Sequence, residues 1–379
     1  MVVFLFTTIC ALAQEQPQVD IGGAVRFNYN YSTWKQGQKN RGGDFGYDIF
    51  RINTKAAYKG IDLDAEYRVM TISAGGGVLK HGIMGYALNK KDKIQLGLLP
   101  IPFGNTPANS SSFFMSMNFF LGLEDSYNMG ANYRHIGDKI DFSFAFFKNP
   151  LVQDYGNNSD LSPKRYGYDV GSIDVDGDGK MSFRNKKINQ INGKVDYKFG
   201  DDNLKVKLGL SAQYGGLYNL ETEKTGDHYA TAVQGMMDWG KLGLKAQYTM
   251  YKYNTKAPAT ESKDMVAMVG FGGAYLIAAE ADTYTFGLSY TVPVNWKPIS
   301  QLCFYNDYAF MNKKVSGFKS SQMNVTGLSF SAGPILTYID FAAGKSQSNF
   351  GYESIYALSN GTGQDKWQTR FNINIGYYF

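Results

Sequence analysis

The stretch VDIGGAVRFNYNYS, residues 19–32, alternates between apolar or aromatic side chains and polar ones. A repeat of two residues is the pattern of a β-strand whose two faces meet different surroundings. Similar alternation recurs in 50–58, 61–70, 191–199, 204–214 and 242–251. In the first stretch the apolar face carries Ile21, Gly23, Val25, Phe27, Tyr29 and Tyr31, and the polar face carries Asp20, Arg26, Asn28, Asn30 and Ser32. The sequence therefore predicts an all-β protein built from amphipathic strands.

The connections between these strands alternate in length. Short turns are expected at 59–60, 89–92, 136–139, 200–203 and 240–241, and long polar loops near 33–44, 71–82, 104–126, 149–186 and 215–227. Strands of about ten residues that end in Tyr and Phe suit a bilayer with aromatic girdles. Because every backbone polar group must pair in lipid, such strands close into a ring. The pattern predicts a transmembrane antiparallel β-barrel with short periplasmic turns and long extracellular loops, so outer-membrane lipid is its first expected partner.

Composition excludes several other classes of protein. The 379 residues include 43 Gly and 15% aromatic side chains, but only 19% charged ones, against about 25% in typical soluble proteins. No apolar run is long enough for a membrane helix, and the aromatic content argues against disorder. The two cysteines, Cys10 and Cys303, do not suggest a disulfide framework. The net charge of +5 comes without a Lys/Arg run, which argues against nucleic-acid binding.

A count of candidate wall strands gives sixteen. They are expected near 19–32, 45–58, 61–70, 80–89, 93–103, 126–135, 140–148, 187–199, 204–214, 228–239, 242–252, 282–293, 300–312, 321–332, 334–345 and 367–379. The apolar stretch 265–278 would make an odd number, whereas bacterial barrels have even numbers. We therefore interpret 253–281 as an extracellular excursion with a β-like segment, and eighteen strands is the alternative.

Both ends of the chain carry recognisable signals. Val2 to Leu12 has the length of a signal-peptide core, and Ala11-Leu12-Ala13 forms an A-x-A pattern, so 1–13 is predicted to be a signal peptide. That leaves 14–379 as a single barrel domain. At the other end Phe379 closes an alternating strand whose apolar positions are Phe371, Ile373, Ile375 and Tyr377. This ending resembles the signal read by the outer-membrane barrel assembly machinery, which is a second expected partner.

The segment Gly97-Leu98-Leu99-Pro100-Ile101-Pro102-Phe103-Gly104 resembles the G-x4-P-F-[GS] strand end of the phosphate-selective (O/P-like) porin family. The resemblance implies a sixteen-stranded homotrimeric channel in the outer membrane of a Gram-negative-type bacterium. It also implies that the loop 104–126 folds into the lumen and narrows it. This loop departs from the phosphate-selective pattern because it has no Lys or Arg. Its notable side chains are Phe113, Phe114, Met115, Met117, Phe119, Phe120, Glu124 and Asp125. Two interpretations stay open: the rings contact sugar-like solutes, or they anchor the loop to the wall.

The polar faces of the strands predict the charges that line the pore. The basic candidates are Arg26, Arg51, Lys55, Arg68, Arg134, Lys194, Lys198, Lys205, Lys207, Lys245 and Arg370. The acidic candidates, Asp20, Asp62, Asp64, Glu66, Asp141 and Asp196, are fewer. Rings of charged groups set ion preference in pores. The excess of basic groups predicts a mild anion bias.

One long loop has the spacing of a calcium-binding loop. Asp174, Asp176, Asp178, Lys180, Ser182 and Asn185 occupy EF-hand positions 1, 3, 5, 7, 9 and 12, and Gly179 occupies the position of the sharp turn. Position 12 is Asn rather than the usual bidentate Glu, and Asp169 is a candidate for the missing carboxylate. The pattern predicts a structural Ca²⁺ that orders the extracellular loop 149–186; the alternative is a hydrophilic acidic loop without metal.

These features predict a porin that passes small hydrophilic solutes and ions by passive diffusion. The first alternative is a substrate-specific channel for phosphate or a sugar-like solute. An outer-membrane enzyme is a weaker alternative, because His81, His135 and His228 are scattered and no hydrolase or zinc motif occurs. A structural barrel plugged by its own loops is a further one. We predict that the chain is not an enzyme, and no catalytic residue is assigned.

Overall fold

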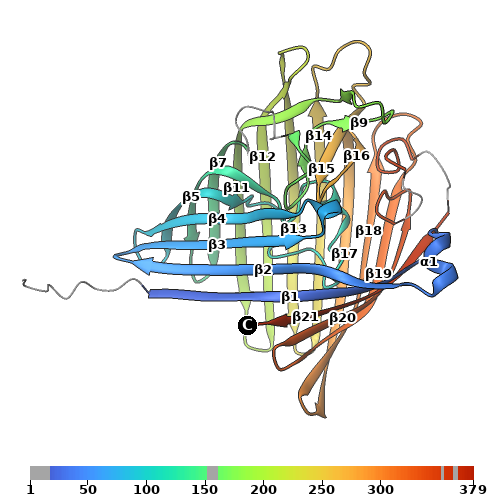
Figure 1. Ribbon diagram of the computed structural model, residues 1–379. Coiled ribbons are helices and arrows are strands. Elements are labelled where there is room, and N and C mark those ends of the chain that lie inside the picture. The colour runs from blue at the N-terminus through green and yellow to red at the C-terminus, as the bar shows by residue number, and fades with distance from the viewer. Residues whose placement is uncertain (1–17, 152–160, 351–353, 362–365) are drawn as a thin grey trace, which may run out of the picture.

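The computed structural model describes residues 18–151, 161–350, 354–361 and 366–379, and these form a closed barrel of sixteen strands (Figure 1). The predicted signal peptide, 1–13, lies outside the described residues. Around the barrel the strands are β1 (Gln18–Ser32), β2 (Asp44–Tyr58), β3 (Ile61–Met70), β4 (Gly77–Ala87), β5 (Asp92–Pro100), β6 (Tyr127–Ile136), β7 (Ile140–Pro150), β11 (Asn185–Gly200), β12 (Leu204–Asn219), β13 (Thr225–Trp239), β14 (Leu242–Asn254), β17 (Glu280–Trp296), β18 (Ile299–Lys313), β19 (Ser321–Ala332), β20 (Ile335–Lys345) and β21 (Gln368–Tyr378).

The strand count of the sequence analysis is confirmed, and the alternative of eighteen is wrong. The apolar stretch 265–278 forms a hairpin of β15 (Met265–Gly270) and β16 (Gly273–Ala278), which pairs with β8 (Asp169–Val170) and not with the wall. This stretch is apolar because it is buried on both faces: Val266, Ala267, Leu276 and Ile277 are all fully buried. A strand of the wall alternates instead, since one face meets the lumen.

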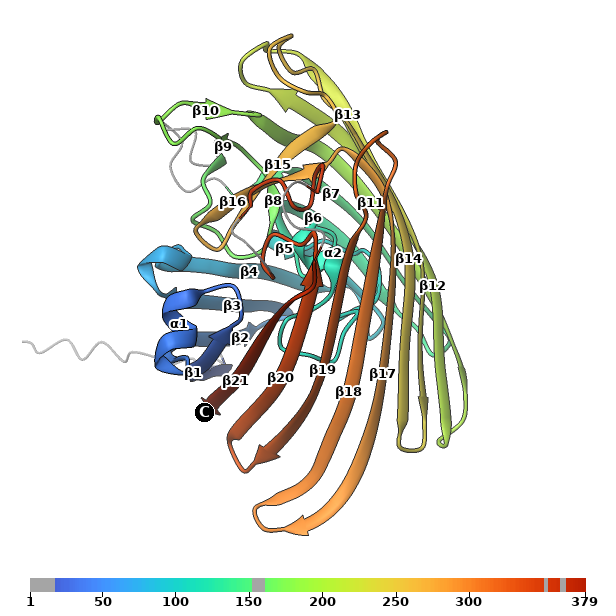
Figure 2. The same cartoon turned by 90° about the vertical axis from the view of Figure 1, so that its right-hand side faces the viewer.

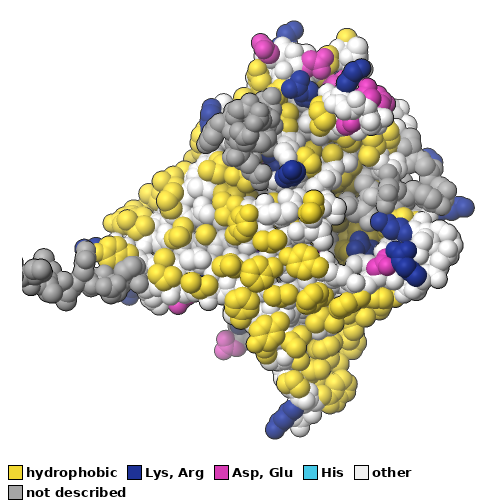
Figure 3. Space-filling model, in the orientation of Figure 1, with side chains coloured by type: hydrophobic (Ala, Val, Ile, Leu, Met, Phe, Trp, Pro, Cys, Tyr) yellow, Lys and Arg dark blue, Asp and Glu magenta, His cyan; other side chains and the backbone are white. Residues whose placement is uncertain are grey.

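The outer surface of the barrel is an apolar band (Figure 3). Outward side chains remain largely exposed in the isolated chain, among them Ile21, Phe144, Leu210, Val233 and Phe341. Their polar neighbours along the same strands face the interior, as the alternation predicts. Within the described residues, no helix is long and apolar enough to span a bilayer.

The barrel closes where β1 pairs with β21, the last strand. Phe379 extends this seam: its N–H donates to the carbonyl of Gly23, 3.1 Å away, and its carbonyl accepts from the N–H of Gly23 at 2.8 Å. A Cβ at Gly23 would lie 2.7 Å from the Phe379 ring and 2.4 Å from the carbonyl oxygen of Arg51. The seam therefore needs glycine at this position.

Short turns connect the strands at one end of the barrel, and long loops fill the other (Figure 2). Two short helices, α1 (Gln36–Arg41) and α2 (Met117–Phe120), a 3₁₀ turn (Ile72–Ala74), and the small pair β9 (Ile173–Asp174) and β10 (Met181–Ser182) belong to these loops. The sheet of β8, β15 and β16 lies inside the curved wall, near α2 (Figure 2). Its side chains join those of the loop 104–126 in the largest hydrophobic cluster. The core of this barrel therefore fills part of the lumen.

Candidate functional site in the lumen

The loop 104–126 follows β5 and extends into the lumen, where it contacts distant strands of the wall. Its root is shaped by Gly97, which has φ +122° and whose added Cβ would lie 2.1 Å from the carbonyl oxygen of Gly82. The backbone N–H of Gly104 then donates to Ser211 Oγ at 2.9 Å, and that of Asn105 donates to Gln247 Oε1 at 2.7 Å. Ser211 and Gln247 belong to β12 and β14. The loop is thus bonded to strands that are not neighbours of the one it leaves.

The tip of the loop is held by a wall carboxylate on β18. Asp307 accepts from the backbone N–H groups of Ser111, at 2.9 Å, and Ser112, at 2.8 Å. Lys245, on β14, donates to the carbonyl of Ser110 at 2.5 Å. Asp307 is 6% exposed, so these bonds lie away from bulk water, where a lost hydrogen bond leaves a costly unpaired group.

The aromatic side chains of the loop divide into two groups. Phe119 and Phe120, in α2, pack against Tyr168, and Phe119 also contacts the ring of Phe271. The hydroxyl of Tyr275, on β16, donates to the carbonyl of Phe120 at 2.5 Å. These two rings anchor the loop to the interior sheet.

Phe113 and Phe114 form the second group and face the seam strands. The guanidinium of Arg26, on β1, lies 5.3 Å from the centre of the Phe113 ring, and that of Arg370, on β21, lies 5.0 Å from Phe114. Arg370 also donates from Nε to Asn30 Oδ1 at 2.9 Å. On this side the tip is thus held by ring contacts, with the two guanidinium groups and, for Phe114, with the ring of Phe350 5.1 Å away.

Glu124 stabilises the fold of the loop from within. Its carboxylate accepts from the backbone N–H of Asn109 at 3.0 Å, from Asn109 Nδ2 at 3.2 Å and from the hydroxyl of Ser116. Burial raises the pKa of Glu124 above the usual range of a carboxyl, although these hydrogen bonds oppose the shift. Its neighbour Asp125 points the other way, toward the wall of β3 and β4.

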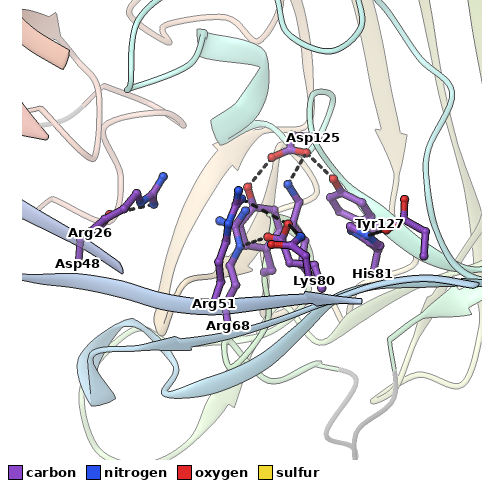
Figure 4. Close-up of polar contacts among 12 residues, drawn as sticks. Arg26, Asp48, Arg51, Arg68, Lys80, His81, Asp125 and Tyr127 are labelled. Atoms are coloured by element: carbon purple, nitrogen blue, oxygen red, sulfur yellow. Dashed lines mark hydrogen bonds and ion pairs between the residues drawn. The ribbon is translucent and has the colours of Figure 1, made fainter. Parts of the chain in front are cut away.

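A cluster of charges on β2, β3 and β4 faces Asp125 (Figure 4). The carboxylate of Glu66 accepts from Arg68, from Arg51 at 3.3 Å and from Asn53 at 2.7 Å. Lys80 Nζ lies 3.6 Å from Asp125 Oδ1 and 4.7 Å from the centre of the Tyr166 ring. Three cations, Arg51, Arg68 and Lys80, thus share two carboxylates, which leaves a local excess of positive charge.

The other predicted lining residues lie in four places. Arg26 pairs with Asp48 at 2.8 Å, close to the loop tip. Lys194 donates to Thr106 Oγ1 at 2.8 Å and Lys207 to the Thr106 carbonyl at 3.3 Å, so both support the root of the loop. The exposed members of the set are Lys55, Arg134 and Lys205. Lys198 pairs with Asp141 at 2.7 Å.

Sequence reasoning missed four residues of this site: Asp48, Lys80, Tyr166 and Asp307. Asp48 and Lys80 lie where the register shifts, between β1 and β2 and between β3 and β4. A bulge inserts one extra residue into a strand and so breaks the two-residue repeat. That repeat was the basis for predicting which side chains face the lumen. Asp307 follows Phe304 and Tyr305 in a strand with rings on both faces, so alternation there does not identify the lumen side. Tyr166 lies in a loop.

The predicted calcium loop folds as a tight turn. Both carboxylate oxygens of Asp174 accept backbone N–H groups, from Gly177 at 2.7 Å and Gly179 at 2.8 Å, and Asp178 lies 3.5 Å from Lys180. Asn185 is fully buried and bonds Asn219 instead. Asp169 is also committed elsewhere, 2.8 Å from Lys187. Among the described residues, no three or more His, Cys, Asp and Glu side chains come together as a metal-binding group.

No protein-family model and no curated protein match the sequence. Solved structures do match over nearly the whole chain. An anion-selective porin from Comamonas acidovorans has a TM-score of 0.59 at 16% identity, with 96% of this chain and 100% of that chain covered. The outer-membrane channel DcaP of Acinetobacter baumannii has a TM-score of 0.59 at 10% identity, covering 97% and 99%.

A third structure, the trimer form of the outer-membrane protein OmpT of Vibrio cholerae, has a TM-score of 0.57 at 13% identity and covers 96% of this chain and 99% of that one. At such identities the likeness concerns the fold. Together with the closed wall, the apolar outer band and the inward-folded loop, it leads to one conclusion. The chain has the sixteen-stranded barrel fold of outer-membrane porins.

Proposed function

We propose that the chain is an outer-membrane channel through which small hydrophilic solutes and ions diffuse passively, with a mild preference for anions. The observation that carries this proposal is the loop 104–126, which crosses a polar lumen and is bonded to the far wall through Asp307. A barrel of this strand number is too wide for wall side chains alone to fill. An inward loop therefore sets the size of the opening. No chemical step at the protein is needed, so we propose that it is not an enzyme.

The anion preference rests on the cluster that contains Arg51, Arg68 and Lys80. These cations outnumber their carboxylate partners, Glu66 and Asp125. The pairs at Arg26–Asp48 and Lys198–Asp141 reduce the excess that a simple count of basic residues predicts. We therefore expect the bias to be small.

Single-channel recording in planar bilayers tests both parts of the proposal. We expect stable conductance steps with linear current–voltage behaviour, and a reversal potential in a salt gradient that indicates anion preference. A cation-selective reversal potential would contradict the bias but not the channel. Absence of conductance from correctly folded protein would contradict the channel itself and favour a plugged structural barrel.

A substrate-specific channel is the second candidate. The observation in its favour is that the Phe113 ring is only partly buried and lies beside the guanidinium of Arg26 on the seam strands. Block of the current by a solute at micromolar to millimolar concentration supports this candidate. Recordings that respond only to the bulk conductivity of the added solution favour general diffusion.

Assembly as a homotrimer, recognition of Phe379 by the barrel assembly machinery and cleavage after 1–13 stay proposals. The trimer is supported by the similar Vibrio cholerae structure, which is a trimer form. Sedimentation of the detergent-solubilised protein tests it. A single species of monomer mass would contradict it.

Calcium binding at 174–185 also stays a prediction. A bound ion would have to replace the N–H groups of Gly177 and Gly179 as partners of the Asp174 carboxylate. We therefore expect at most weak affinity, with a dissociation constant on the order of 10⁻⁴–10⁻³ M. The measurement is protease cleavage within 149–186 with and without Ca²⁺, compared with the double variant Asp176→Ala/Asp178→Ala. Equal cleavage of the unmodified protein in both conditions would remove the prediction.

A further inference from the structure

Three neighbouring strands, β20, β21 and β1, present a strip of polar side chains to the lumen under the tip of the loop. The register places Asp340, Asn372 and Asn30 in one row across the strands, and Tyr338, Asn374 and Asn28 in the next. Asp340, Asn372 and Asn374 are each no more than 1% exposed. We call these six residues the seam strip.

The seam strip contains polar atoms that the folded chain leaves unpaired. Among the described residues, neither the side-chain oxygen nor the nitrogen of Asn372 has a hydrogen-bond partner, and the side-chain oxygen of Asn374 has none. Asn374 uses its nitrogen to bond Asn28 at 2.6 Å. Buried groups of this kind are rare in folded proteins because losing water without a replacement bond is costly. An incoming polar molecule would satisfy them.

The unpaired atoms call for a partner that both donates and accepts. Asn372 offers two N–H donors and one acceptor oxygen, and Asn374 Oδ1 and Asp340 Oδ2 offer further acceptors. A hydroxyl group can serve either role, whereas a phosphate or carboxylate oxygen can only accept when ionised. Several hydroxyl groups on one small molecule match this set better than an anion does.

The charges around the seam strip are balanced, unlike those of the cluster at Arg51, Arg68 and Lys80. Arg26 is paired with Asp48, and Asp48 also lies 3.3 Å from Asn374 Nδ2. Arg370 and Asp340 supply one further cation and one further carboxylate. An anion therefore gains no net charge attraction here, which favours a neutral ligand.

Aromatic rings flank the strip. The rings of Phe113 and Tyr338 have centres 6.2 Å apart, and Phe113 covers the guanidinium of Arg26. Flat rings beside hydrogen-bonding side chains suit the two surfaces of a sugar, since its C–H face packs on a ring and its hydroxyls bond polar groups. Ligand sites combine apolar walls with a few placed polar groups in this way.

We propose that the seam strip, together with the ring of Phe113, is a binding subsite for neutral polyhydroxylated solutes such as short saccharides. This inference rests on the proposed channel function and names the class of solute that the channel holds. Asn372 supplies the central donor and acceptor, and Phe113 supplies the stacking surface. The subsite is separate from the positively charged cluster on β2, β3 and β4.

Titration calorimetry of the detergent-solubilised barrel with maltose, and separately with inorganic phosphate, tests the subsite without relying on conduction. We expect millimolar binding of maltose that phosphate does not compete with. The variant Asn372→Leu keeps the size of the side chain but removes both polar atoms, and it should weaken maltose binding by about tenfold or more, as a site built for hydroxyl groups does when a partner is lost. Phe113→Ala, in the loop, should weaken it without altering the wall.

The matched control is Asn132→Leu, because Asn132 is also a buried lumen asparagine, on β6, but outside the strip. It should leave maltose binding unchanged. Competition by phosphate, equal loss in the control variant, or no maltose binding by folded protein would each overturn the subsite. Bilayer recordings of the same samples separate the two proposals: conduction without maltose binding defeats only the subsite, whereas binding without conduction defeats only the channel.

Discussion

The two flanks of the loop 104–126 are held in different ways. On the side of β12, β14 and β18 its backbone is hydrogen-bonded to Ser211, Gln247 and Asp307. On the side of the seam strands it is in contact through the rings of Phe113 and Phe114 with Arg26 and Arg370. Hydrogen bonds to buried groups fix position and direction, whereas ring–cation contacts tolerate sliding.

The two flanks of the loop therefore differ in the free energy that it costs to displace them. Displacing the bonded flank would leave several buried N–H groups and a carboxylate without partners, which is unfavourable. Displacing the ring flank exposes Arg26 and Arg370, whose polar groups solutes and water can then bond. For the proposed channel we therefore expect the opening on the seam side, next to the charged cluster, and we call this side the open flank.

Asp307→Ala should have the largest effect on this comparison, because it removes the acceptor for two backbone N–H groups at the loop tip. We expect the local stability of the loop to fall by about 2–4 kcal/mol and the conductance to rise. Protease cleavage in 104–126 and single-channel recordings measure these changes. Asp238→Ala removes an exposed carboxylate elsewhere and should change neither. A loop that stays equally protected in Asp307→Ala would mean that the bonded flank does not fix it.

Lys80→Gln tests the charge of the open flank. Lys80 lies beside Asp125 and the Tyr166 ring, in the cluster with excess positive charge. Loss of one unit charge at close range in water corresponds to about 1 kcal/mol, so the anion-to-cation permeability ratio should fall about threefold to fivefold. The reversal potential in a salt gradient measures it. Lys91→Gln, in an exposed turn, is the control, and an equal shift in both variants would contradict a role for the cluster.

Glu124→Gln should have the smallest effect, visible mainly in its dependence on pH. Because burial raises the pKa of Glu124, the folded loop favours the protonated carboxyl. Its contribution to stability is fully present below the ordinary Glu pKa and is lost as pH rises through the raised value. The protection of amides in 104–126 against hydrogen exchange, corrected for the intrinsic rise of exchange rates with pH, should therefore fall as pH rises. The Gln variant should lack this dependence, and an unchanged pH profile would refute the assignment.

The wall could be predicted from sequence because each strand faces two different media. In 19–32 the two-residue repeat alone predicts that Phe27 faces outward and Arg26 faces the lumen. The structure confirms this prediction. The stretch 265–278 was set aside from the wall for a different reason, because counting it would give an odd number of strands. Local chemistry decides the first case, and the closure of the whole barrel decides the second.

The contents of the lumen could be predicted only in part. The loop 104–126 and its aromatic residues, Phe113 among them, were identified from the sequence. Whether the Phe113 ring contacts the wall or the interior sheet of β8, β15 and β16 depends on segments distant in the sequence. Asp307 lies almost two hundred positions from the serines it bonds. Asp48 and Lys80 depend on register shifts, which one sequence does not reveal.

The pairing of β1 with β21 also bears on how the barrel forms. Most wall strands meet the strand next to them along the chain, so those hairpins close over short distances. Arg26 pairs with Gly376, near the other end of the polypeptide. Bringing such distant segments together costs conformational entropy before the contacts between them form. Closure at Gly23 and Phe379 is therefore expected to be the slowest step of folding. Until it occurs both terminal strands expose unpaired edges, and an intermediate stalled there would be prone to associate with a second copy.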